Sequence, residues 1–191
     1  MPRRSLPATV ALATLLAACK GPVVPHPMTS ETRYLCCNMH YEKTEISDVN
    51  YLKGTIIPFG TRVQVLEVRK NSVKFQPAGH PTITLVLRYG KEAITMDQYL
   101  DRIFVREDPH TKLPRPGKDR KQAAAAERTR KLIEEATVEP GMTKDEVLMA
   151  LGYPPVHRTP SLSAPMWTYW ANRWATFEVY FDGDKVARVQ R

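Results

Sequence analysis

The stretch Glu139–Pro155, EPGMTKDEVLMALGYPP, constrains the fold of this chain most, because it specifies both ends of one short helix. Thr143 and Glu146 have the T-x-x-E spacing of a capping box, in which each side chain accepts a hydrogen bond from the other residue's backbone amide. Gly152 can take the left-handed conformation that ends a helix, and the prolines after it prevent continuation. One face of this helix is apolar and needs a partner: Val147, Leu148 and Leu151.

The chain after this helix predicts that partner. Apolar and polar residues alternate without a break over Trp174–Phe181, as in a strand with one buried face. Met166–Trp170 and Lys185–Gln190 predict two further strands. A preceding helix is predicted over Ala123–Ala136, because its alanines favour helix. Residues 123–191 are therefore expected to form two helices packed on a three-stranded antiparallel meander.

Several short motifs of this part have the order and spacing of a known family: Gly141-Met142-Thr143, Glu146-Val147, Leu151-Gly152-Tyr153-Pro154, Trp167-Thr168-Tyr169-Trp170, Val179, Phe181 and Gly183-Asp184-Lys185-Val186. On these motifs the C-terminal third resembles the SmpA/OmlA (BamE-like) family of outer-membrane lipoproteins. The resemblance implies a non-catalytic role in β-barrel assembly and envelope integrity, through contacts with protein partners and anionic lipid. The chain departs from the family because a whole β-rich unit precedes the shared part.

The N-terminus predicts a bacterial lipoprotein signal peptide over residues 1–18. Two arginines precede the apolar stretch Leu6–Ala18, which is too short to span a bilayer. The end of this stretch, Leu16–Cys19, resembles a lipobox, which implies cleavage before Cys19 and lipidation of that cysteine, with palmitate among the acyl chains. An ordinary cleaved signal peptide is the alternative. Lys20 in place of Asp implies the outer membrane, with the protein facing the periplasm.

Residues 34–107 predict a small β-rich unit. It lies between a proline-rich tether, residues 19–33, and a proline-rich basic linker, residues 108–122. The stretch Ile57–Thr61 is similar to the entry into a strand of bacterial SH3-like domains, which implies a small SH3-like barrel. The whole chain is therefore expected to be an α+β protein.

Local patterns place three features inside this unit. Strands are predicted over Arg62–Arg69 and Thr82–Tyr89, where apolar residues alternate with polar ones. The alternation changes parity near Val65-Leu66, which predicts a β-bulge. Thr95 and Gln98 form a second capping box, so a short helix is expected to cover the barrel.

The formal net charge is +8, and removal of the signal peptide would leave +6. The segment Lys112–Lys131 accounts for this excess, with eight basic and two acidic residues. Such a segment is expected to contact anionic lipid head groups, or else to be a solvated linker and helix face. An exported protein meets little nucleic acid, so that partner is excluded. The basic candidates are Arg120, Lys121, Arg128, Arg130 and Lys131.

A second candidate surface lies on the outer face of the predicted meander. Large aromatic residues with an arginine are typical of interface hot spots, and four such residues are predicted to point away from the helices. They are expected to bind an envelope protein, or else to be covered by the β-rich unit. The residues are Trp170, Arg173, Trp174 and Tyr180.

The sequence favours neither catalysis nor a cofactor. Cys36, Cys37 and His40 are types that bind zinc, but no second ligand pair accompanies them. In an oxidising compartment the two cysteines are expected as a free pair, a vicinal disulfide or an intermolecular bond. His157 lies near Ser161 and Ser163 in the sequence, without a nucleophile motif. No metal site is predicted.

Together these patterns predict a non-catalytic lipoprotein that acts as a binding or scaffold factor in the bacterial envelope, in outer-membrane protein assembly. The alternative is a cell-wall-binding or inhibitor-type module, in which the SH3-like unit binds peptidoglycan or an exported enzyme.

Overall fold

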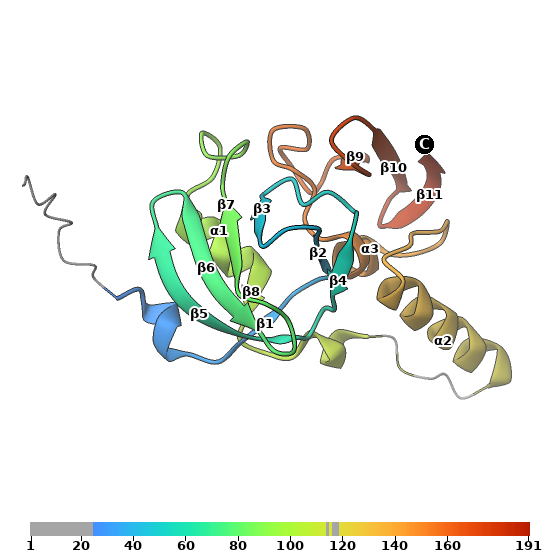
Figure 1. Ribbon diagram of the computed structural model, residues 1–191. Helices are drawn as coiled ribbons and strands as arrows, with labels where there is room; N and C mark the ends of the chain where they lie inside the picture. The colour runs from blue at the N-terminus through green and yellow to red at the C-terminus, as the bar shows by residue number, and fades with distance from the viewer. Residues whose placement is uncertain (1–24, 114, 116–118) are drawn as a thin grey trace, which may run out of the picture.

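The computed structural model describes residues 25–113, 115 and 119–191, which have a mixed α+β fold. The predicted signal peptide and Cys19 lie outside the described residues. A six-stranded sheet with the order β3-β7-β6-β5-β1-β8 curls into a half-barrel (Figure 1). Its strands are β1 (Arg33–Leu35), β3 (Glu45–Ser47), β5 (Arg62–Arg69), β6 (Ser72–Pro77), β7 (Ile83–Val86) and β8 (Phe104–Val105).

The concave side of the half-barrel is filled by alternate residues of β5, β6 and β7, because successive side chains of a strand point to opposite faces. Helix α1 (Met96–Ile103) packs into the same core and begins at the predicted capping box of Thr95 and Gln98. The expected covering helix is thus confirmed. This core includes Val63, Val65, Val73, Phe75, Ile83, Leu85, Met96, Tyr99, Leu100 and Ile103.

The predicted bulge in β5 is also confirmed. The register with β6 shifts between Val65 and Glu67, which leaves Leu66 on the outside with 43% of its surface exposed. An extra residue in one strand flips the parity of every residue after it. The bulge therefore explains why the apolar pattern changes face within a single strand.

The strand predicted over Thr82–Tyr89 is shorter in the structure, because β7 ends at Val86. The buried carboxylate of Asp48 accepts hydrogen bonds from the amides of Arg88, Tyr89 and Gly90, at 2.9, 3.1 and 2.7 Å. These amides are therefore unavailable to a neighbouring strand. The predicted alternation puts Tyr89 on the same strand face as Ile83 and Leu85, but in the structure it is exposed and stacks against His157.

The C-terminal part contains the antiparallel three-stranded sheet that the sequence predicts, in the order β11-β10-β9. The first helix begins three residues earlier than expected, because Asp119 caps it by accepting from the amide of Gln122 at 2.8 Å. The elements are α2 (Arg120–Glu134), α3 (Lys144–Leu151), β9 (Met166–Trp170), β10 (Thr176–Asp182) and β11 (Lys185–Gln190).

Helix α3 has both predicted ends: the capping box of Thr143 and Glu146 is formed, and Gly152 follows with a φ of 79°. Val147 and Leu151 are buried as expected. Met149 and Ala150, on other faces of the helix, are buried as well. Both belong to the C-terminal core, because α3 packs against helix α2 as well as facing the C-terminal sheet. Leu148 is only half-buried.

The two parts of the chain share an interface instead of being separated by a free linker. Phe59, from the β-rich part, belongs to the C-terminal core, and the amide of Leu52 donates to the carbonyl of Trp170 at 3.1 Å. The predicted linker contributes too, since Pro109–Lys112 forms a 3-10 helix and Leu113 is buried in that core. A two-stranded sheet of β2 (Met39–Tyr41) and β4 (Thr55–Ile57) belongs to the β-rich part.

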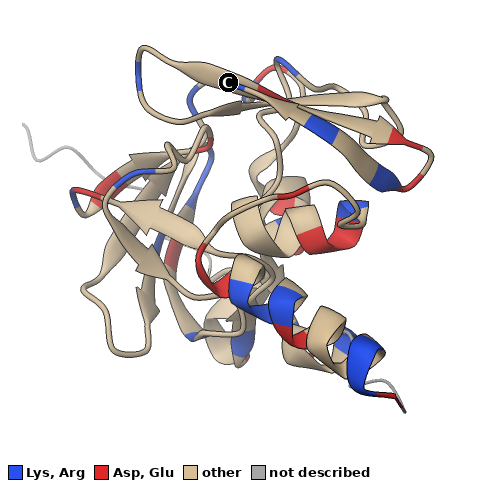
Figure 2. Ribbon diagram, turned by 90° about the vertical axis from the view of Figure 1, so that its right-hand side faces the viewer, with Lys and Arg blue, Asp and Glu red and all other residues tan. Residues whose placement is uncertain are grey.

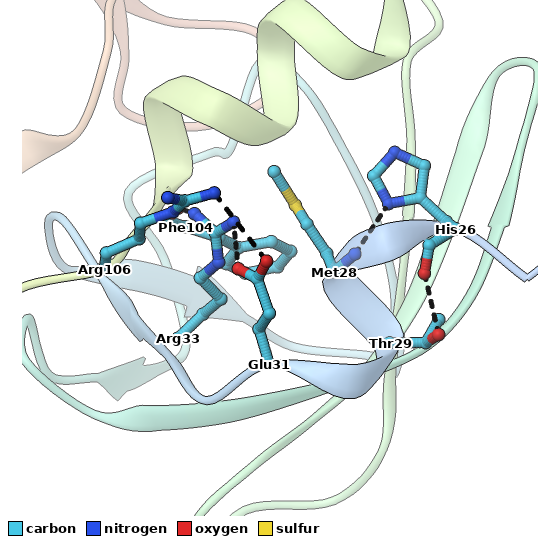
Figure 3. A network of polar contacts seen from close by, with 7 residues as sticks. All are labelled: His26, Met28, Thr29, Glu31, Arg33, Phe104 and Arg106. Atoms are coloured by element: carbon cyan, nitrogen blue, oxygen red, sulfur yellow. Dashed lines mark hydrogen bonds and ion pairs between the residues drawn. The ribbon is translucent and has the colours of Figure 1, made fainter.

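The segment expected to be a tether is folded over its described part. Residues Pro27–Ser30 form a 3-10 helix, which buries Met28 in the half-barrel core. The buried Arg33 pairs with Glu31 and donates to the carbonyl of Phe104 at 3.3 Å, while Arg106 also approaches Glu31 (Figure 3). Burial of a methionine and neutralisation of a buried arginine both hold this segment against the sheet.

Candidate functional site

The clearest candidate surface is the loop between β9 and β10. The side-chain oxygen of Asn172 accepts from the amides of Trp174 and Ala175, at 2.8 and 3.1 Å, which fixes the loop as an Asx-type turn. The guanidinium of Arg173 lies 4.6 Å from the centre of the Trp174 ring. Trp174 is 83% exposed, so the turn that Asn172 holds presents its large apolar face to solvent.

Trp170 does not belong to this exposed surface. Its ring meets the edge of Tyr51 at 6.5 Å between centroids, and the adjacent Leu52 binds its carbonyl. Its indole nitrogen is buried and has no hydrogen-bond partner among the described residues. The sequence left open whether the β-rich part or a partner protein covers these aromatic residues. For Trp170, the β-rich part covers the side chain.

Tyr180 lies apart from the loop as well. Trp170 is opposite Thr176 in the sheet, and Tyr180 is four residues further along β10, about 13 Å away at strand spacing. Its ring packs against Arg188 at 3.5 Å, and its hydroxyl donates to Glu178 at 2.6 Å. This hydrogen bond raises the pKa of Tyr180. The four predicted residues therefore do not form one continuous patch.

The structure instead places residues of the β-rich part beside the loop. A depression of about 390 Å³ is lined by Asn172, Arg173 and Trp174 from the loop, and by Glu42, Tyr51 and Lys53 from the turns that flank β4 and β2. Lys53 and Glu42 form an ion pair at 2.9 Å. We call these six residues the tryptophan-loop surface. No sequence pattern indicates the last three, because the stretch from residue 42 to 54 lacks periodicity and only the tertiary contact brings it here.

A second depression, of about 240 Å³, shares Glu42, Tyr51 and Lys53 and extends toward Tyr89. Burial raises the pKa of Tyr51, and its hydrogen bond with Tyr89 acts in the same direction. The raised pKa of Tyr51 favours its neutral form, which can donate a hydrogen bond. The tryptophan-loop surface thus continues into a polar hollow on the β-rich part.

The basic candidates lie on one helix, α2, whose blue bands are visible in Figure 2. Two of them are already paired with carboxylates: Arg128 with Glu139, and Lys131 with Glu135 at 3.8 Å. Arg130 also has an interaction partner. Arg120 and Lys121, at the exposed start of the helix, are the remaining cations of this set. The charge available to a lipid head group is therefore concentrated in the first turn.

The cysteine–histidine cluster is not arranged as a metal site. Cys36 and Cys37 form a disulfide with each other, which is one of the three states that the sequence left open. Burial lowers the pKa of His40, and both of its ring nitrogens lack hydrogen-bond partners among the described residues. In the described part of the chain, no group of three or more His, Cys, Asp or Glu residues could hold a metal ion.

The serine and histidine side chains of the loop before β9 do not form a nucleophile–base pair. Ser161 and Ser163 bond to each other at 2.7 Å between their hydroxyl oxygens, and His157 stacks on Tyr89 with 5.6 Å between centroids. Within residues 119–191, no hydrogen bond connects His157 to either serine. Their geometry is that of a structural loop.

Fold and surface together define an α+β protein with a fixed, exposed tryptophan loop at the junction of a half-barrel and a three-stranded sheet. Comparisons with protein-family models, with curated proteins and with solved structures gave no match. Among the described residues, no helix has the length and apolar character needed to cross a membrane.

Proposed function

We propose that the protein is a non-catalytic lipoprotein of the bacterial outer membrane, anchored through Cys19 and facing the periplasm, that binds an envelope protein through the tryptophan-loop surface. The β-rich part is of the SH3-like type and residues 123–191 are of the SmpA/OmlA (BamE-like) type in this proposal. A role in outer-membrane protein assembly follows from the family resemblance.

One observation carries the proposal: Trp174 is 83% exposed, yet its loop is fixed by Asn172 and its ring lies against Arg173. A large apolar side chain in water costs free energy that a partner can recover, and a fixed loop loses little entropy on binding. Tryptophan, tyrosine and arginine are the residue types that dominate interface energetics. All three occur in the tryptophan-loop surface.

The lipid anchor gives the first test. We expect Cys19→Ala to move the protein from the membrane fraction to the soluble fraction, because loss of the acyl chains removes ~0.8 kcal/mol for each methylene that was buried in the bilayer. Immunoblots of separated fractions measure the change, with Cys36→Ala as the control that alters a cysteine of the folded part. A Cys19→Ala protein that stays with the membranes contradicts the lipid anchor.

The partner surface gives the second test. With a photo-crosslinking amino acid at position 174, we expect a discrete heavier species on irradiation of intact cells, because this side chain would lie inside the interface. The matched control is position 66, since Leu66 is also an exposed apolar residue but lies on β5 of the half-barrel. Gel shifts and mass spectrometry identify the adduct. Arg173→Ala should weaken crosslinking several-fold, because arginines at hot spots contribute more than ~1 kcal/mol.

Three outcomes of this test are informative. A protein adduct formed from position 174 and not from position 66 supports the proposal. Equal adducts from both positions, or none from position 174, contradict it. An adduct with cell-wall material in place of a protein favours the cell-wall-binding module, in which the polar hollow around Tyr51 takes the ligand.

A further inference from the structure

The Cys36–Cys37 disulfide lies at the joint between the half-barrel and helix α3. On one side, the amide of Cys36 donates to the carbonyl of Ile103 at the end of α1, at 3.0 Å. On the other side, Cys37 is 3% exposed and faces the turn after α3, where a Cβ atom on Gly152 would come within 3.8 Å of its sulfur. The disulfide thus joins Cys36, which is hydrogen-bonded to the half-barrel part, to Cys37, which packs on the turn after α3.

The residue after the disulfide makes most of the polar contacts of this joint. The amide of Asn38 donates to the carbonyl of Met149 at 2.9 Å. Its side-chain nitrogen donates to the carbonyls of Ile133 and Ala150, at 2.5 and 3.1 Å, and its side-chain oxygen accepts from the amide of Phe59 at 2.9 Å. The position of Asn38 therefore determines how both helices of the C-terminal part meet the half-barrel.

One of the two sulfur-bearing residues is reachable from outside. Cys36 is half-buried and lines a cleft of about 490 Å³ between the half-barrel and α3, whereas Cys37 is enclosed. The apolar walls of this cleft include Phe104, Leu148 and Met149. Accessible disulfides are the ones that exchange with thiols and regulate proteins, while enclosed ones are structural.

We propose that the Cys36–Cys37 disulfide is a thiol–disulfide exchange site, entered through this cleft, whose redox state sets the rigidity of the joint. The reductant is a dithiol, either a small molecule or an exported dithiol protein. Its thiolate attacks the sulfur of Cys36, the bond between the two cysteines breaks, and Cys37 leaves as a thiolate that takes up a proton. The second thiol of the reductant then releases Cys36, so the disulfide gains two electrons and the dithiol becomes a disulfide.

Reduction acts on the joint through the backbone. A disulfide between neighbouring residues closes a small ring that includes their peptide bond, so the oxidised pair has little freedom to rotate. The reduced pair regains that freedom directly before Asn38. The hydrogen bonds of Asn38 to the helices then form and break more often, and local opening exposes α3 to solvent exchange.

The test uses the full chain with Cys19→Ser, so that only Cys36 and Cys37 can provide thiols, and dithiothreitol as the dithiol. Iodoacetamide labelling of the native protein is expected to add nothing before reduction and two groups after it, with Cys36 labelled first. Hydrogen exchange measured by mass spectrometry is expected to rise about tenfold for Asn38 and α3 on reduction, because these amides exchange through local opening. The turn of the β5–β6 hairpin, where Arg69 pairs with Ser72 at the end of β5 far from β1, should be unchanged.

The variant Cys36→Ser with Cys37→Ser is expected to exchange like the reduced protein and to ignore dithiothreitol. If this variant does not fold, comparing hydrogen exchange in the oxidised and reduced native chain still tests whether the disulfide controls the rigidity of the joint. Labelling of both cysteines before reduction, a disulfide that dithiothreitol reduces only in urea, or equal exchange in both redox states would each overturn the proposal.

Discussion

Replacement of Asn38 by alanine is expected to destabilise the protein by ~3–5 kcal/mol, which is among the largest effects that a single substitution produces. Asn38 is 1% exposed, and its side chain makes three hydrogen bonds to backbone groups. Alanine would leave the carbonyl of Ala150 and the amide of Phe59 without partners, whereas the carbonyl of Ile133 would keep the amide of Ala136, at 3.0 Å. Each unpaired buried group costs about 1–3 kcal/mol, and water has little room to replace the lost side chain.

The measurement is urea unfolding, followed by circular dichroism. Asn172→Ala is the matched control, because Asn172 also bonds two backbone amides but does so in an exposed loop, and its loss should cost less than ~1 kcal/mol. Asn38→Asp separates shape from hydrogen bonding: it keeps the size and the acceptor but removes the amide donors that face two carbonyls. A stable Asp variant, or equal losses for Asn38→Ala and Asn172→Ala, would disprove this role of Asn38.

Asn38 also illustrates which features of the fold the sequence could not indicate. Its partners Ile133 and Ala150 are 95 and 112 residues away, and no periodic pattern connects residues so far apart. The parallel pairing of β3 with β7 is of the same kind, since β3 has three residues and no clear alternation. Local signals do better because their partners lie within one turn or one strand. The capping box at Thr143 and the bulge at Leu66 are therefore both found where the sequence predicts them.

For the candidate surface, too, the sequence indicated local features but not contacts between distant parts of the chain. Alternation along the predicted strand correctly indicated that Phe177, Val179 and Phe181 are buried, because side-chain direction in a strand has a period of two. It placed the start of the strand too early, since β10 begins at Thr176 and Trp174 lies in the loop before it. It did not indicate that Tyr51 covers Trp170, since that contact joins two parts of the chain with no shared pattern. The separation of Tyr180 from Trp174 follows from strand spacing alone once the register is known.

Substitution of Trp167 is the prediction that tests the C-terminal core. Trp167 is fully buried, its ring lies 4.6 Å from that of Phe181, and the ammonium group of Lys144 lies 5.7 Å from its centre. Trp167→Ala should cost ~3–5 kcal/mol, because the core would keep a cavity where the indole was. Trp174→Ala, at the exposed tryptophan, should change the free energy of unfolding by less than about 0.5 kcal/mol.

The phenylalanine variant makes this test more specific. The indole nitrogen of Trp167 is buried and has no hydrogen-bond partner among the described residues, so the native state bears the cost of an unpaired donor. Trp167→Phe removes that donor while it keeps a ring against Phe181, and the relief offsets part of the lost contact. We therefore expect Trp167→Phe to cost only ~0–2 kcal/mol in urea unfolding, well below the alanine variant. Equal losses for the two variants would show that the indole donor is satisfied in solution and that the whole indole is needed to fill this core.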